Sequence, residues 1–145
     1  MKKTKSDNKK INISKIKVQL WNECKRIVRA KYMNKDGTWT CYTCNKTLIY
    51  PKDIHTAHGK SKGSLSIKYK YDLRNLKCCC YNCNINLGGA TDIFLAKLEK
   101  EKEGLEFLKE TCIKDEFGAW RLKHDDCLIQ SKYFLPQLLE EYKLL

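Results

Sequence analysis

The chain has 145 residues, a formal net charge of +12 and nine cysteines. This length allows one domain with a modest hydrophobic core. The polar N-terminus lacks the apolar stretch of a secretory signal peptide, and no run approaches the roughly 20 apolar residues of a membrane span. We therefore expect a cytoplasmic protein with no membrane partner, whose cysteines stay reduced.

The positive charge is concentrated in the first part of the chain. Residues 1–35 hold 12 lysines and arginines against 2 acidic residues, whereas residues 92–145 hold 9 against 12. A basic N-terminal part of the chain favours binding to a polyanion, for which nucleic acid is the strongest candidate. Because lysine heavily outnumbers arginine, a lysine-rich composition without such a partner remains an alternative.

The first third of the chain contains a polar segment and then a helical pattern. Residues 1–10 are polar and basic, which predicts a disordered basic arm. Residues 14–33 predict an amphipathic helix with Ser14 as its N-cap. The apolar face of that helix is formed by Ile16, Leu20, Trp21, Cys24, Ile27, Val28 and Met33. The NKDG sequence that follows predicts a turn.

The middle of the chain predicts short strands. The TWTCYTC sequence combines alternation with β-propensity and indicates a strand that ends in a metal-binding turn. Residues 53–58 predict the first strand of a hairpin, and residues 71–79 predict the strand that returns. Between them, residues 59–66 form a polar loop rich in Gly, Ser and Lys.

The last third of the chain is predominantly helical. Leucines at helical spacing predict a helix over residues 92–110, and Gly104 suggests that it is divided into two. Residues 113–145 predict a helical extension packed on or next to the core. Pro136 fits the first turn of its final helix.

Two C-x-x-C pairs carry the clearest chemistry. Cys41 and Cys44 form the first pair, and Cys80 and Cys83 form the second. Four thiolates in this spacing match the ligands of a structural Zn²⁺ site. The 35 residues between the pairs exceed the roughly 15–20 of a simple zinc ribbon, so additional structure must fit between them. Cysteines expected to be core thiols are Cys24, Cys112 and Cys127.

The order of the chemical groups resembles that of the HNH endonucleases. His58 and Asn75 lie between the two cysteine pairs, Asn75 precedes Cys80 by five residues, and Cys83–Asn84 opens the next helix. A closer resemblance is to the phage recombination protein NinG (Rap) family. This resemblance spans about residues 20–110. The stretches that support it are WNECKRIVRAKY, CYTC, AHGKS, YDLRNLKCCCYNCN, LGG and LAKLEKEKEGLEFL.

This resemblance implies an α+β fold with a small zinc-supported ββα-metal (HNH) core and flanking N- and C-terminal helices. Residues 11–112 would then be a zinc-bound nuclease domain. The implied activity is metal-dependent, structure-selective DNA cleavage in recombination, on branched substrates such as Holliday junctions and D-loops. Since resolving a four-way junction normally needs paired cuts, we expect a homodimer, whose interface the N-terminal helix or the apolar C-terminal segment would supply. A phage-encoded chain would act in the host cytoplasm.

The residues suggest how such an enzyme would work. A neutral His58 can take the proton of an attacking water as general base. By resemblance, Asn75 holds the hairpin and orients the base, and Asn84 offers its side-chain oxygen to Mg²⁺ or Mn²⁺. Many HNH proteins place a metal-binding Asp where this chain has Ala57. His55, two residues away on the same strand face, is the better candidate for the missing ligand, with Asp53 as the other.

Several readings remain open from the sequence. The expected phosphate contacts are Lys60, Lys62, Lys68, Lys70 and Arg74, some of which will simply be solvated. His58 and Asn75 could also be ordinary loop residues. An HNH nicking or homing endonuclease acting on duplex DNA is one alternative function. A non-catalytic, zinc-stabilised nucleic-acid-binding module is another, and Ala57 is its best support.

Overall fold

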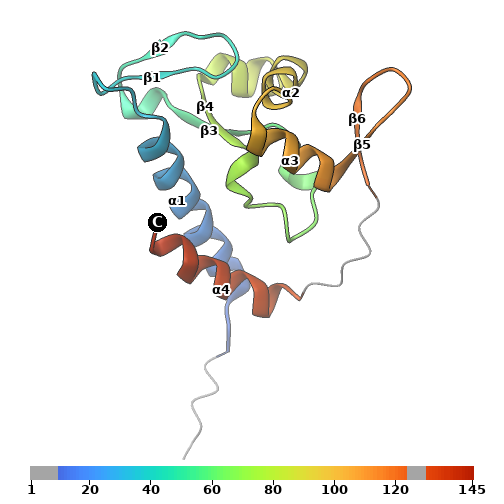
Figure 1. The fold of residues 1–145 in the computed structure, drawn as a ribbon. Coiled ribbons are helices and arrows are strands. Elements are labelled where there is room, and N and C mark those ends of the chain that lie inside the picture. Colours follow the sequence, from blue (N-terminus) through green and yellow to red (C-terminus); the bar gives the residue numbers. More distant parts are fainter. Residues whose placement is uncertain (1–9, 124–129) are drawn as a thin grey trace, which may run out of the picture.

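The computed structural model describes residues 10–123 and 130–145. The expected basic arm, apart from its last residue, and Cys127 lie outside the described residues. The described elements form an α+β fold in which the strands pair as three separate antiparallel hairpins (Figure 1). They are α1 (Ile13–Tyr32), β1 (Trp39–Thr40), β2 (Thr47–Leu48), β3 (His55–His58), β4 (Leu76–Cys79), α2 (Thr91–Leu98), α3 (Lys102–Thr111), β5 (Cys112–Lys114), β6 (Trp120–Leu122) and α4 (Ser131–Lys143). The predicted α+β class is confirmed. Within residues 10–123 and 130–145, no helix combines the length and apolar character needed to cross a membrane.

Helix α1 forms where the apolar periodicity predicts it. Its N-cap is Asn12 rather than Ser14, because the Asn12 side chain accepts a hydrogen bond from the backbone N–H of Lys15 at 3.1 Å. Leu20, Cys24 and Val28 of the predicted face are buried, whereas Met33, at the C-cap, is 53% exposed. The expected core thiol at position 24 is thus confirmed, as is the one at position 112.

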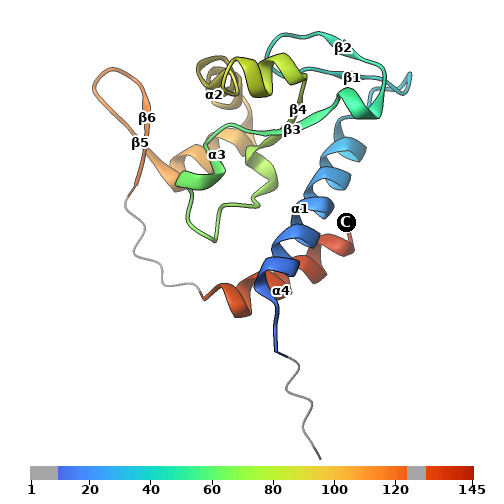
Figure 2. The same cartoon turned by 180° about the vertical axis from the view of Figure 1, so that it is seen from behind.

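Helix α4 packs across α1, as both ribbon views show (Figures 1 and 2). Its buried residues are Leu135, Leu139 and Tyr142. The Tyr142 hydroxyl donates to the buried carbonyl of Tyr71 at 2.6 Å, and the Arg26 guanidinium donates to the carbonyl of Tyr142 at 3.0 Å. The apolar faces of both terminal helices are therefore used within the chain, although the sequence suggested them as a dimer interface.

Pro136 lies inside α4, so its expected position in the first turn is wrong. The helix begins at Ser131 and includes Leu135, which is completely buried. Burying a leucine contributes about 1.5–3 kcal/mol. That is comparable with the cost of about 3 kcal/mol for a proline within a helix, which has no N–H to donate.

The β3–β4 hairpin lies between α1 and the α2–α3 pair (Figure 1). His55 pairs with Cys79, and His58 pairs with Leu76. All four residues of β4 are buried. The loop from Gly59 to Asn75 leaves the end of β3 and returns to the start of β4. It is longer than the predicted loop over residues 59–66, because β4 begins at Leu76 rather than at Tyr71. The candidate functional residues therefore sit at the edges of a well-buried hairpin.

The predicted helix over residues 92–110 is divided into α2 and α3. The break lies at residues 99–101, whereas Gly104 is inside α3 and buried. A Cβ atom at position 104 would lie 2.3 Å from the carbonyl oxygen of Leu98 and 2.7 Å from its Cδ1. Gly104 therefore allows the close approach of α3 to the end of α2.

We predict that Gly104→Ala destabilises the fold by about 2 kcal/mol, because the new methyl group overlaps a backbone carbonyl that cannot move alone. Gly63→Ala is the matched control, since the nearest atom to its new Cβ is the Ser61 hydroxyl at 3.9 Å. Its effect should stay within about 0.5 kcal/mol. Urea unfolding measures both, and equal stability of the two variants would contradict this packing.

Candidate functional site

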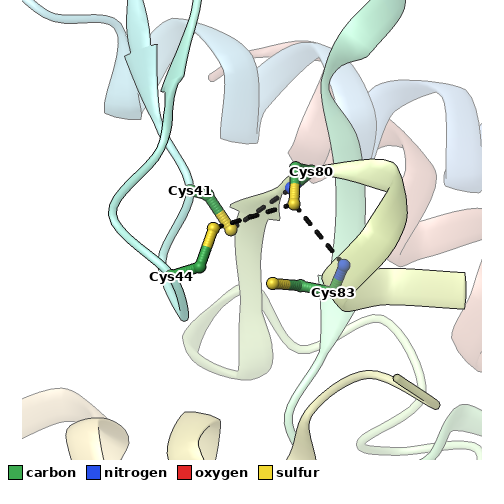
Figure 3. Close-up of side chains that lie close together, drawn as sticks. All are labelled: Cys41, Cys44, Cys80 and Cys83. Carbon is green, nitrogen blue, oxygen red and sulfur yellow. Dashed lines mark hydrogen bonds between the residues drawn. The ribbon is translucent and has the colours of Figure 1, made fainter. Parts of the chain in front are cut away.

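The two C-x-x-C pairs meet in one cluster (Figure 3). Cys41 and Cys44 lie on the turn between β1 and β2, and Cys80 and Cys83 follow β4. Their four sulfur atoms all lie within 4.8 Å of one another, and those of Cys44 and Cys80 are 3.8 Å apart. Tetrahedral Zn–S bonds of about 2.3 Å place neighbouring sulfurs about 3.8 Å apart. These cysteines could therefore hold a metal ion such as zinc.

Hydrogen bonds from backbone N–H groups to the cysteine sulfurs favour the thiolate form. The N–H of Cys80 donates to the sulfur of Cys41 at 3.3 Å, and the N–H of Cys83 donates to the sulfur of Cys80 at 3.4 Å (Figure 3). Burial alone would raise the pKa of Cys41. However, hydrogen bonds from the backbone and from Thr43 outweigh it and lower this pKa to about 6. These contacts therefore favour the thiolate form of Cys41.

Asn75 closes the long loop between β3 and β4. Its side chain is fully buried. The carboxamide oxygen accepts from the N–H of Lys60 at 2.8 Å, and the amide nitrogen donates to the carbonyl of Lys60 at 2.9 Å. A Cβ atom at Gly59 would lie 2.9 Å from that carboxamide oxygen and 2.8 Å from the Phe94 ring. We call this paired contact the Asn75 clasp; glycine at position 59 leaves room for it.

His58 ends β3 and is held in a fixed orientation. Its ring stacks on Trp21, with centroids 5.1 Å apart and an interplanar angle of 13°. Its Nε2 lies 3.3 Å from the carbonyl oxygen of Lys70. Because a carbonyl only accepts, Nε2 carries the proton in this bond and Nδ1 keeps a free lone pair. Burial lowers the pKa of His58 to about 4, so the ring is neutral at pH 7.

His58 and Asn84 open onto the same cleft, which has a volume of about 400 Å³. Asn84 lies on a π-helical turn, Asn82–Asn86, directly after the metal-ligand candidate Cys83. Lys60 and Lys62 also line the cleft, and none of its lining residues is acidic. The cleft is therefore electropositive and contains one neutral imidazole and one carboxamide. The sequence did not indicate that Gly88, Gly89 and Thr91 would complete its wall.

His55 is not part of this cleft. It lines a second cavity together with Asp53, and its ring meets the edge of Tyr81 at 5.5 Å between centroids. The expected pairing of His55 with Asn84 at one divalent ion stays a prediction, and the two residues line different cavities. Along a strand, residues three apart point to opposite faces, so His55 and His58 are separated by strand geometry. Ala57 is buried and offers no ligand.

The five expected phosphate contacts separate into three groups. Lys60 and Lys62 line the cleft, and the Lys62 ammonium lies 4.8 Å from the centroids of both the Trp21 and Tyr71 rings. Lys68 and Lys70 lie outside the cleft lining. Arg74 is bound by Asp72 at 2.7 Å and by Glu110 at 2.8 Å. Because these two carboxylates already bind its guanidinium, Arg74 does not fit the role of a phosphate contact.

In comparisons with protein-family models, curated proteins and solved structures, nothing matches this chain. The geometry itself provides two distinct sites. One is a cluster of four thiols, and the other is a basic cleft with a neutral histidine. Such a cleft can bind a phosphate and accept a proton from water.

We predict that Cys44→Ser lowers the affinity for Zn²⁺ at least about ten-fold and makes folding independent of chelator. Cys44 is exposed, so its loss removes no core packing. Cys112→Ala is the control, because this buried thiol lies outside the cluster and its loss should leave metal content unchanged. Metal analysis and thermal unfolding with and without chelator measure both. A Cys44→Ser chain with full metal content would exclude the cluster as the site.

His58 should make the fold sensitive to acid. The unfolded histidine titrates near pH 6.5 and the folded one at about 4. Between these values only the unfolded state takes up the proton, so stability is lost as pH falls through this window. Urea unfolding at pH 7.0, 5.5 and 4.5 should show a smaller loss for His58→Gln than for the unsubstituted chain. Protonation of the thiolates lowers the stability of both chains equally, so it cancels in the comparison. An equal loss of stability with falling pH in both chains would contradict the burial of a neutral His58.

Proposed function

We propose that this chain is a metal-dependent, structure-selective DNA endonuclease acting in recombination. The observation that supports this most directly is that His58 and Asn84 open onto one basic cleft, which Lys60 and Lys62 also line. His58 and Asn84 are groups that the resemblance to HNH and NinG-like enzymes selects. In this proposal, the cysteine cluster is structural and the cleft performs the chemistry.

The ion in the cysteine cluster is proposed to be Zn²⁺. Thiolate ligands in tetrahedral geometry favour zinc, and four protein ligands leave no open position for a substrate. The cluster joins the β1–β2 turn to the end of β4, two segments far apart in the sequence. Its role is therefore to hold the cleft's supporting turns in place.

His58 is proposed to be the general base. Its Nδ1 takes a proton from water while the water oxygen attacks phosphorus, and the bond to the leaving 3′ oxygen breaks. The hydrogen bond to Lys70 and the stack on Trp21 hold this tautomer and orientation before substrate binds. Lys60 and Lys62 offset the negative charge that accumulates on the phosphate.

A Mg²⁺ or Mn²⁺ ion would relieve charge on the phosphate and the leaving oxygen. Asn84 is the cleft residue that fits such an ion, through its carboxamide oxygen. Since the cleft lining has no carboxylate, most of the remaining ligands would be water and the DNA phosphate itself. We therefore propose that the ion binds with the substrate rather than before it.

The substrate is proposed to be branched DNA and the active unit a homodimer. Both ideas rest on the resemblance to NinG-like proteins and on the need for paired cuts at a four-way junction. Since α1 and α4 bury their apolar faces against each other, the dimer surface would lie on other elements.

One observation favours a second candidate function, a zinc-stabilised module that binds nucleic acid without cutting it. The cleft has basic side chains but no carboxylate for a catalytic ion, and Ala57 stands where many HNH proteins have an aspartate. The same cysteine cluster and the same lysines would serve this function equally well.

We predict that His58→Ala reduces cleavage of a synthetic four-way junction at least about 100-fold, because it removes the general base. Thr56→Val is the matched control on the same strand; it lies outside the cleft lining and should cut as the unsubstituted chain does. The assay compares the junction with linear duplex of the same sequence, with Mg²⁺ and with Mn²⁺. Zinc content and DNA affinity of each variant are measured in parallel.

Three outcomes would count against the proposal. Equal cleavage by His58→Ala would remove this residue from the chemistry. Equally rapid cleavage of linear duplex would favour a nicking or homing endonuclease. DNA binding without cleavage in either metal would favour the non-catalytic module.

A further inference from the structure

A second concave surface lies beside the cysteine cluster, on a different part of the hairpin from the cleft. Its volume is about 820 Å³. The residues that define it are Lys46, Ile49, Tyr50, Lys52, His55 and Tyr81. We call this surface the tyrosine groove. The proposed nuclease chemistry uses none of these residues.

The groove exposes large apolar side chains that the core does not need. Ile49 is 61% exposed, Tyr50 is 59% exposed and Tyr81 is 55% exposed. Tyr81 also meets the ring of His55 at an interplanar angle of 65°. Aromatic rings that remain in water while lining one hollow indicate a planar ligand that stacks on them.

The charges of the groove indicate what that ligand carries. Lys46 and Lys52 stand beside the rings, and the Lys52 ammonium lies 5.7 Å from the centroid of the Tyr50 ring. Asp53 is the single acidic residue in the lining. A planar base attached to an anionic phosphate satisfies both features, because the base stacks on tyrosine and the phosphate pairs with lysine. An uncharged apolar peptide would leave both lysines without a partner.

We propose that the tyrosine groove binds an unpaired nucleotide of DNA. Part of this inference rests on the proposed function, since it assumes that the bound strand is the one presented to the cleft. His55 in the groove and His58 in the cleft are three residues apart on β3, which corresponds to about 10 Å. Because the two side chains point to opposite faces of β3, DNA that reaches both sites would have to pass around the hairpin, along a path longer than this distance. An unpaired base held in the groove would then fix how a branch point approaches the cleft.

The groove depends on the cysteine cluster for its shape. Cys44 and Cys80 are both among its lining residues, one from each C-x-x-C pair. The metal site therefore joins the β1–β2 side of the groove to the Tyr81 side. Removing the ion should separate the two tyrosines and abolish base binding.

The test measures binding of a fluorescein-labelled oligothymidylate to the zinc-loaded chain, without added Mg²⁺ or Mn²⁺, by fluorescence anisotropy. The double variant Tyr50→Ala/Tyr81→Ala should bind at least about ten-fold more weakly, since stacking on aromatic side chains supplies much of the affinity for single strands. Tyr133→Ala is the matched control. This tyrosine is 66% exposed on α4, away from the groove, and its loss should change affinity less than two-fold.

An abasic strand of the same length separates stacking from charge. It should bind the unsubstituted chain and the double variant equally, because it keeps the phosphates and lacks the bases. An equal loss of affinity for both strands would overturn the inference, as would tighter binding of oligouridylate than of oligothymidylate. Unchanged oligothymidylate binding by the double variant would also overturn it and would assign the exposed rings to a protein partner.

The test is independent of cleavage. Base binding is measured without Mg²⁺ or Mn²⁺, so the readout does not depend on whether DNA is cut. If the unsubstituted chain cuts no DNA but the double variant loses base binding, the proposed function fails while the groove assignment stands. If junctions are cut normally and the groove binds no base, the groove assignment fails while the proposed function stands.

Discussion

The contact between four sulfur atoms brings two segments that are distant in the sequence together beside both cavities. Each C-x-x-C pair sits on a turn of its own, and neither turn has a long strand or helix to hold it. Cys83 immediately precedes Asn84, so the cluster positions one wall of the cleft. Cys44 and Cys80 line the tyrosine groove, so the same cluster also shapes the second cavity. In a small fold whose strands have two to four residues, a metal ion in this cluster would supply the link between segments that a larger sheet supplies elsewhere.

Within the cleft, orientation comes from neutral contacts rather than ion pairs. The Asn75 clasp binds both backbone groups of Lys60, and His58 is fixed by a ring stack and one carbonyl. The charged pair nearby, Arg74 with Glu110, instead joins the loop to α3. Among the described residues, no carboxylate therefore lines the cleft beside its lysines, and this arrangement suits a site for a phosphate.

Local patterns predicted the fold better than they predicted the site. The C-x-x-C spacing selected the right cysteines, and apolar periodicity located α1 and the α2–α3 pair. Contacts between residues that are distant in the sequence could not be predicted from these local patterns. Arg74 looked like a phosphate contact because Glu110, its partner, lies 36 residues further along the chain. Strand alternation by itself places His55 and His58 on opposite faces of β3.

The absence of a side chain at position 59 has a consequence for the loop that follows β3. Any larger residue there would push against Phe94 or break the Asn75 clasp, so a substitution at this position would act through folding. The requirement for glycine is therefore architectural and does not depend on what the neighbouring His58 does.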